Sequence, residues 1–214
     1  MGLDLEYTDG QTPLDEDEKE GLLIKTISNR GELNEFEQLN IEKAVLWTLK
    51  RKFKADNILS EAFIKQLHRK MYSDVWKWAG NFRKTNKNIG VDKLQIGIEL
   101  RTLIDNCKFW ITNKSFSEDE IAIRFKHRLV SIHCFTNGNG RHSRLIADII
   151  AEQIFKRPVF SWGAANKSND DVRKKYLTAV RAADGGEFGL LVAFAKTDKI
   201  FSHLLSLLIC TTIS

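Results

Sequence analysis

The residues best suited to chemistry lie together between Ser131 and Arg144, in the run S-I-H-C-F-T-N-G-N-G-R-H-S-R. A histidine is followed by two glycines that alternate with asparagines, and then by two arginines three positions apart. The strongly apolar stretch that comes next predicts a helix beginning at about Gly138. This order of residue types is typical of a proton acceptor that enters an anion-binding loop at the N-terminus of a helix.

The glycines and arginines of this run predict a nucleotide-phosphate site. Gly138 and Gly140 allow backbone conformations that other residues avoid, so several N–H groups can converge on one oxyanion. Arg141 and Arg144, spaced i and i+3, fall on one helical face and can donate paired hydrogen bonds to phosphate oxygens. His133 arrives from the preceding helix and could serve as the general base beside the bound phosphates.

Taken singly, a histidine at a helix end or an N-G-N-G turn is more often structural than functional. The combination is specific, because His133 to Arg144 resembles the motif of the Fic family, H-P-F-x-D/E/N-G-N-G-R-x-x-R. The resemblance covers about residues 60–195 and includes the segment W-A-G-N-F-R that ends at Arg83. Two positions depart from the motif: Cys134 replaces the usual proline, and Asn137 stands where the family often has a carboxylate.

The resemblance implies an all-α, Fic-like helical bundle with one small β-hairpin flap, and the activity of a protein adenylyltransferase. Such an enzyme moves AMP from ATP to a hydroxyl side chain of a protein target. In this sequence His133 would be the catalytic base. Asn137 would help to hold Mg²⁺, although a neutral amide oxygen is a weaker ligand for a hard cation than a carboxylate. The phosphate-binding residues would be Gly138, Asn139, Gly140, Arg141 and Arg144.

A possible inhibitory glutamate precedes the core. In one class of the family, the motif S/T-x-x-x-E-G/N lies on a helix before the core, and the run that starts at Ser28 is similar to it. The match is imperfect because Leu33 replaces the expected glycine or asparagine. The resemblance implies that Glu32 pairs with Arg144 and blocks the γ-phosphate. Without the resemblance, Glu32 is an ordinary acidic residue in the first turn of a helix.

A second segment of interest follows Arg83. The run T-N-K-N-I-G-V-D-K-L-Q-I-G breaks helical periodicity and predicts a short β-hairpin. In the family this hairpin is a flap over the active site that binds an extended segment of the target by strand addition. An ordinary surface hairpin is equally compatible with these residues. The target-docking flap would contain Asn88, Ile89, Gly90 and Val91.

Several amphipathic helices must position these residues. Apolar residues at three- and four-residue steps predict a helix from about Glu32 and another after Ser60, which is a good N-cap. Ser117 opens a capping box for the helix that delivers His133. A later helix, capped by Asn169, should end at two glycines. We divide the chain into an N-terminal arm, an inhibitory helix region, a core and a C-terminal helix: 1–25, 26–59, 60–195 and 196–214.

Composition limits the possible partners and surroundings. The formal charge of +5 is spread along 214 residues, which favours a solvated basic surface and no nucleic-acid or membrane partner. Three scattered cysteines do not make a disulfide framework or a zinc site, so we expect a reducing cytoplasm. The N-terminus lacks the features of a secretory signal. The apolar tail from Ile200 to Ile213 is too short to span a membrane and predicts a buried helix.

Other functions remain open at this point. Members of the Fic family also transfer phosphoryl, uridylyl or phosphocholine groups, and the sequence does not distinguish among these donors. A nucleotide-binding regulator with little catalysis is a further possibility, given Asn137 and an inhibitory Glu32. A cysteine hydrolase using Cys134 and His133 is least favoured, because adjacent residues rarely orient as nucleophile and base. An antitoxin-like partner or self-modification would also suit the family.

Overall fold

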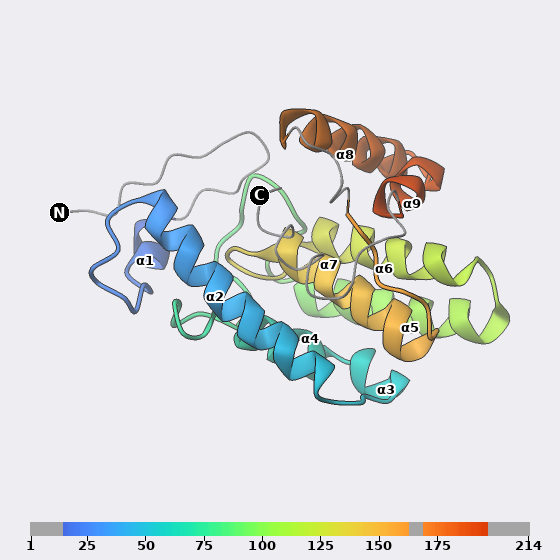
Figure 1. The fold of residues 1–214 in the computed structure, drawn as a ribbon, viewed down its shortest axis with the longest axis horizontal. Coiled ribbons are helices and arrows are strands. Elements are labelled where there is room, and N and C mark those ends of the chain that lie inside the picture. The colour runs from blue at the N-terminus through green and yellow to red at the C-terminus, as the bar shows by residue number, and fades with distance from the viewer. Residues whose placement is uncertain (1–14, 163–168, 197–214) are drawn as a thin grey trace.

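The computed structural model describes residues 15–162 and 169–196, and these ranges form a helical bundle (Figure 1). The all-α class predicted from the sequence is confirmed. A single turn of π-helix, Ile150–Ile154, extends α7. The helices are α1 (Glu16–Lys19), α2 (Arg30–Leu49), α3 (Ala55–Ile58), α4 (Glu61–Tyr72), α5 (Ile96–Asn113), α6 (Glu118–Ile132), α7 (Asn139–Ile149), α8 (Asn169–Asp184) and α9 (Gly189–Ala195).

The helix starts follow from short polar residues at the predicted caps. Ser60 accepts a hydrogen bond from the backbone N–H of Phe63 at 3.2 Å, which fixes the start of α4. Ser117 accepts from the N–H of Glu120 at 3.3 Å and fixes the start of α6. Both N-caps are as predicted, but the capping box at Ser117 is incomplete, because the carboxylate of Glu120 accepts from Arg124. The caps set the register in which α4 and α6 present their apolar faces.

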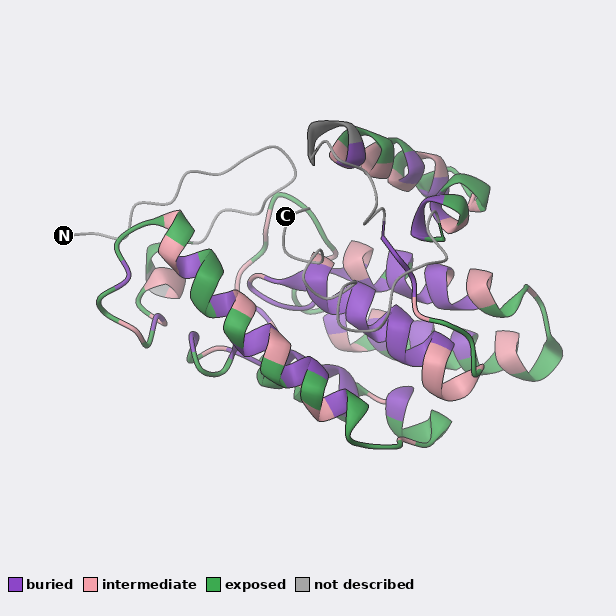
Figure 2. Cartoon of the chain, in the orientation of Figure 1, coloured by how far each residue is buried: buried purple, intermediate pink, exposed green. Residues whose placement is uncertain are grey.

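The core is built around α7, which lies next to α6 and also contacts α4 (Figures 1 and 2). Nearly every residue of α7 is buried, including its arginines. Helix α2 packs along α4, and α5 packs along α6. The motif helix is therefore covered by other elements on several sides. A buried charged residue on α7 must find its partners within the protein.

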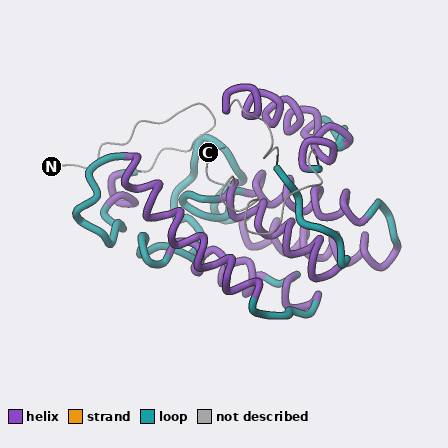
Figure 3. Tube along the Cα trace, viewed as in Figure 1, coloured by secondary structure: helices purple, strands orange, loops and turns teal. Residues whose placement is uncertain are grey.

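The predicted β-hairpin does not form: among the described residues no strand is present, and residues 84–95 make bends and turns (Figure 3). The physical reason lies in Arg83, whose guanidinium donates hydrogen bonds to the backbone carbonyls of Thr85 and Val91. Asn86 also bonds across the loop to Asp92 and to the N–H of Lys93. Side chains thus replace the ladder of main-chain bonds that a hairpin would require.

Helices α8 and α9 close the described part of the chain and pack against each other, and α9 also packs against α6. His127 of α6 contacts Asp184 of α8 at 2.8 Å, and the carbonyl of Ala195 accepts a hydrogen bond from the N–H of Ser161 at 2.8 Å. Apart from Lys196, the predicted C-terminal helix lies outside the described residues. None of the helices in the described ranges has the length and apolarity required to cross a membrane.

Candidate functional site

The motif loop turns sharply between α6 and α7. His133 ends α6 in the left-handed conformation, with φ of 56°, and Gly138 caps α7 with φ of 76°. A Cβ atom at Gly138 would lie 2.4 Å from the ring of Tyr72. Glycine is therefore required here both for its backbone angle and for its lack of a side chain. The prediction that a helix begins at about Gly138 is confirmed, since α7 starts one residue later.

Asn139 holds the loop in this shape. Its side-chain oxygen accepts a hydrogen bond from the N–H of Phe135 at 2.9 Å, and its side-chain nitrogen donates to the carbonyl of the same residue at 2.7 Å. Both polar atoms of this amide are thus bonded to the loop backbone. In the described conformation Asn139 positions the backbone amides that the sequence predicts as phosphate ligands.

Phe135 anchors the loop in the core. Its ring is fully buried and stacks on His68 with the ring centroids 3.7 Å apart. The Nδ1 atom of His68 accepts from the N–H of Gly80, so its Nε2–H donates to the carbonyl of Asn137 at 3.0 Å. Burial, the first cause, places the pKa of His68 well below its usual value, and its proximity to His142 acts in the same direction. His68 is therefore a neutral support of the loop.

Arg83 links the backbone of the histidine to the loop that covers it. Its Nε donates to the carbonyl of His133 at 2.7 Å, and its backbone N–H donates to the carbonyl of Cys134 at 3.0 Å. The same guanidinium binds the carbonyls of Thr85 and Val91. Because Arg83 is itself buried, these bonds lock His133 in its left-handed conformation.

The imidazole of His133 is 5% exposed and neutral. Burial lowers its pKa to about 4, and the nearby cations of Arg83 and Lys87 act in the same direction because they disfavour the imidazolium. A neutral imidazole can accept a proton. His133 is thus suited to the role of general base that the sequence predicts for it.

The predicted target-docking residues cover His133, although not as a hairpin. The N–H of Val91 donates to the carbonyl of Ile132 at 3.3 Å. A Cβ atom at Gly90 would lie 2.6 Å from the Cβ atom of His133, so this approach is open only to glycine. Ile89 is 47% exposed on the outer side of the loop. The segment therefore lies directly against His133 and the end of α6.

The two motif arginines have different partners. Arg141 forms a buried ion pair with Glu37 of α2, with Nη2 and Oε2 2.7 Å apart. The other carboxylate oxygen of Glu37 accepts a hydrogen bond from Nε1 of Trp76 at 2.6 Å. Arg144 is also buried, and its guanidinium lies over the ring of Tyr176 of α8, 5.3 Å from the centroid. The arginines are therefore held by α2 and by α8, respectively.

Glu32, the predicted inhibitory residue, lies at the start of α2. Its carboxylate accepts hydrogen bonds from the N–H and the hydroxyl of Ser28 at 2.8 and 3.1 Å, which lowers its pKa. Its own N–H donates to the side chain of Asn29, the N-cap. Glu32 thus belongs to the helix cap, and the expected pair with Arg144 does not form between these described residues.

The metal and nucleophile predictions concern the same loop. The side-chain oxygen of Asn137 accepts from the N–H of Gly138 at 2.6 Å. Within the described ranges, no group of three His, Cys, Asp or Glu residues could hold a metal ion. Burial raises the pKa of Cys134 to about 12, which keeps its thiol protonated and removes support for a cysteine hydrolase.

The sequence does not predict several contacts that support the motif, among them those of Glu37, Arg83 and Tyr176. Glu37 had a detectable signal, because it lies four residues after Leu33 on the buried face of α2. A charge on an apolar face often marks a buried ion pair. Arg83 ends the W-A-G-N-F-R segment that the resemblance includes, but the segment does not indicate the contact with His133. Tyr176 carried no comparable pattern.

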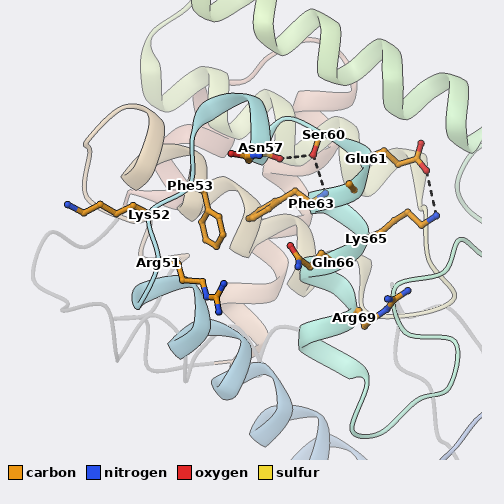
Figure 4. A pocket seen from close by; sticks show the side chains of 11 residues that line it. Arg51, Lys52, Phe53, Asn57, Ser60, Glu61, Phe63, Lys65, Gln66 and Arg69 are labelled. Atoms are coloured by element: carbon orange, nitrogen blue, oxygen red, sulfur yellow. Dashed lines mark hydrogen bonds and ion pairs between the residues drawn. The ribbon is translucent and has the colours of Figure 1, made fainter.

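A groove of about 1,060 Å³ lies away from the motif, between the segment after α2 and the outer side of α4 (Figure 4). Phe53 and Phe63 lie at its base, with ring centroids 4.9 Å apart. Basic side chains, including those of Arg51 and Arg69, surround it. None of the motif residues lines this groove, so it is separate from the site built around His133.

Fic domains are among the solved structures that resemble this chain. BepC from Bartonella tribocorum, solved with bound AMPPNP, is 16% identical, with a TM-score of 0.62 over 88% of this chain and 92% of that one. The N-terminal Fic domain of a Bartonella quintana protein, solved with bound ADP, is 15% identical, with a TM-score of 0.59 over 86% and 91%. Fic-1 from C. elegans is 18% identical, with a TM-score of 0.58 over 81% of this chain and 49% of that one.

These likenesses show the fold, and the sequence adds the family. No curated protein sequence matches the chain significantly. Residues 58–151 match the model of the Fic/DOC family. This range contains α4, α5, α6 and α7 together with the whole motif from His133 to Arg144. Residues 58–151 therefore form a Fic/DOC family domain.

Proposed function

We propose that this protein is an adenylyltransferase that moves AMP from ATP to a hydroxyl side chain of a protein target. The observation that carries the proposal is the buried, neutral imidazole of His133, locked beside a helix N-terminus that bears two buried arginines. The nucleotides bound to BepC and to the Bartonella quintana domain support a nucleotide site in this fold. A protein target is supported by the exposed loop that covers the histidine.

The reaction follows from the positions of these groups. A serine, threonine or tyrosine oxygen of the target attacks the α-phosphorus, and His133 accepts the proton that the hydroxyl loses. The new bond joins this oxygen to the α-phosphorus, and the bond from the α-phosphorus to the bridging oxygen breaks, which releases pyrophosphate. Backbone amides at Gly138, Asn139 and Gly140 would stabilise the α-phosphate oxygens.

Arg141 and Arg144 would bind the β- and γ-phosphates, respectively, and so stabilise the charge on the leaving pyrophosphate. Mg²⁺, when bound, would neutralise charge between the α- and β-phosphates. The side-chain oxygen of Asn137 is the ligand that the chain offers for it. One neutral oxygen fits Mg²⁺, because this ion commonly takes its remaining ligands from phosphates and water.

The covering loop suggests how a target is oriented. Asn88, Ile89, Gly90 and Val91 form its section nearest His133, and an extended target segment could bind to their backbone. Since the loop makes no hairpin of its own in the described conformation, the target would supply the pairing strand. Because Gly90 lies close to His133, a target segment bound along the loop would place its hydroxyl near the imidazole of His133.

We place the restraint on activity in α2. Glu37 holds Arg141 in a buried pair, so the β-phosphate would compete with this carboxylate for the arginine. Glu32, which the sequence suggests as the inhibitory residue, would act indirectly by capping α2 through Ser28. A nucleotide-binding regulator with little catalysis is the second candidate, because both motif arginines are engaged by protein side chains.

Label transfer from ATP tests the reaction. The Glu37→Gln variant is incubated with Mg²⁺, cell lysate and ATP labelled either at the α- or at the γ-phosphate. The proposal expects protein-bound label from the α-position alone. Protein-bound label from the γ-position would indicate phosphoryl transfer and contradict adenylyl transfer. Nucleotide binding without transfer of either label would favour the nucleotide-binding regulator.

A further inference from the structure

A buried polar cluster lies behind the second motif arginine and joins three helices. Arg144 of α7 is 3% exposed, and its side chain is hydrogen bonded to that of Tyr176 of α8. Its guanidinium also lies over the aromatic ring. The position of this arginine is therefore set by a residue about thirty positions later in the chain, outside the part that matches the family model.

A second cation reaches the same phenol. Lys126 of α6 is fully buried, and its Nζ donates a hydrogen bond to the hydroxyl oxygen of Tyr176 at 2.6 Å. Its Nζ also lies 4.7 Å from the centroid of the tyrosine ring. A buried ammonium is costly unless acceptors surround it. Tyr176 therefore serves as a shared acceptor for two cations, Lys126 and Arg144.

The electrostatics of Tyr176 agree with this arrangement. Burial raises its pKa, but the cations of Lys126 and Arg144 outweigh burial, and the pKa lies below its ordinary value. Burial raises the pKa of nearby Asp148 to about 8, and its oxygens accept hydrogen bonds from the N–H of Phe160 and from Trp162. At neutral pH this carboxyl is mostly protonated, so it offsets little of the positive charge.

We propose that Tyr176 and Lys126 position Arg144 for the terminal phosphate of the donor, and so determine specificity for a nucleoside triphosphate over a diphosphate. This inference rests on the proposed nucleotide site. A phosphate oxygen is a stronger hydrogen-bond acceptor than a phenol, so the γ-phosphate of a triphosphate can attract the guanidinium of Arg144. Tyr176 meanwhile keeps this guanidinium oriented toward the phosphate. The charge of Lys126 adds to the attraction. A diphosphate that reaches only Arg141 gains neither effect.

A purely structural cluster would behave differently. Removing a hydrogen bond that only holds α8 in place would weaken the fold and lower the affinity for every nucleotide by a similar factor. Removing one that positions Arg144 would weaken triphosphate binding and leave diphosphate binding nearly unchanged. The ratio of the two affinities therefore separates the two roles, and it can be measured without any transfer reaction.

Calorimetric titration with AMPPNP and with ADP, both with Mg²⁺, tests the proposal on four forms of the full chain. These are the wild type, Tyr176→Phe, Lys126→Met and Thr178→Ala, a control at an exposed position of α8. We expect the wild type to bind AMPPNP more tightly than ADP. In Tyr176→Phe and Lys126→Met this preference should fall about tenfold, with the ADP affinity nearly constant. Thr178→Ala should match the wild type.

An equal loss of both affinities, or an unchanged ratio in Tyr176→Phe, would overturn the proposal. So would a wild type without preference for AMPPNP. Tyr176→Phe retains the ring that packs under Arg144, so it serves as the conservative variant if Lys126→Met unfolds. A changed ratio in a protein that transfers no AMP would keep this inference and reject adenylyl transfer, so the two failures can be told apart.

Discussion

His133 combines a left-handed backbone, rare for a residue with a side chain, with an imidazole that stays neutral because of burial and neighbouring cations. Both properties depend on Arg83, which binds the carbonyl of the histidine and contributes positive charge. The imidazole of His133 therefore stays unprotonated at neutral pH, but its low pKa also makes it a weaker base. Its protonation state should change only in acid.

This pKa predicts the pH dependence of the reaction. Because the pKa of His133 in the free protein is about 4, the acid limb of kcat/KM should have its midpoint near pH 4, well below the 6.5 of an ordinary histidine. Lys87→Met removes one of the cations that lower this pKa, so it should move the midpoint to higher pH. A pH profile of AMP transfer measures both. A midpoint near 6.5 in the wild type would contradict the neutral, buried state of this residue.

Asp148 makes a second prediction at this scale, on stability. Its pKa is raised from 3.8 to about 8 by burial, so the folded protein holds a proton that the unfolded chain releases. The resulting stabilisation is complete below pH 3.8 and is lost as pH rises through 8. Between pH 5 and 7.5 the wild type should therefore lose on the order of 1 kcal/mol per pH unit relative to Asp148→Asn.

Urea unfolding of both proteins at several pH values checks this difference. Asparagine keeps an oxygen for the N–H of Phe160 and cannot ionise. The variant is therefore the reference for the wild type, because all other groups titrate in both proteins. A constant difference between the two proteins across this range would show that Asp148 is ionised in the fold.

At the scale of elements, α2 supplies the carboxylate that pairs with Arg141. The apolar periodicity of the sequence predicts this helix; Leu33 and Ala44 are buried, while Phe36 of the same predicted stripe is 39% exposed. The resemblance to the inhibitory motif, however, points to Glu32, which caps the helix, while Glu37 makes the contact. Sequence can show that a carboxylate lies on a helix. It cannot show which turn of that helix will meet an arginine more than a hundred residues away.

Glu37→Gln should weaken the fold and strengthen nucleotide binding. Glutamine keeps an oxygen for Trp76 but leaves buried Arg141 without its carboxylate, which should cost about 3 kcal/mol in urea unfolding. The released arginine can then bind phosphate, so the affinity for AMPPNP should rise about tenfold. Glu35→Gln, at an exposed position of α2, is the matched control and should change neither quantity. Unchanged affinity in Glu37→Gln would show that this pair does not restrain the site.

The loop after Arg83 shows the other limit of sequence reasoning. Its turn residues and alternating apolar residues are typical of a hairpin, and its place beside His133 could be inferred only through the resemblance. The pattern cannot reveal that the guanidinium of Arg83 occupies the carbonyls of Thr85 and Val91. By contrast, the motif loop was predictable, because Gly138 and Asn139 serve local geometry.

At the scale of the molecule, the two motif arginines connect the Fic/DOC domain to elements outside it. In the view of Figure 1, α7 lies between α2, which holds Arg141, and α8, which holds Arg144. Neither of these helices belongs to the range matched by the family model. In the proposed mechanism the core would supply the base and the loop, while the flanking helices would control how the arginines meet a nucleotide. This division predicts a weakly active wild type that one substitution in α2 activates.

The most direct test measures AMP transfer from ATP labelled at the α-phosphate in three proteins: the wild type, Glu37→Gln, and Glu37→Gln combined with His133→Ala. Each is incubated with Mg²⁺ and cell lysate, and protein-bound label is quantified. We predict weak label with the wild type, strong label with Glu37→Gln and none with the double variant. Two results would contradict an adenylyltransferase that uses this histidine. One is protein-bound label in the double variant, which lacks His133. The other is the absence of label with Glu37→Gln although this variant still binds AMPPNP.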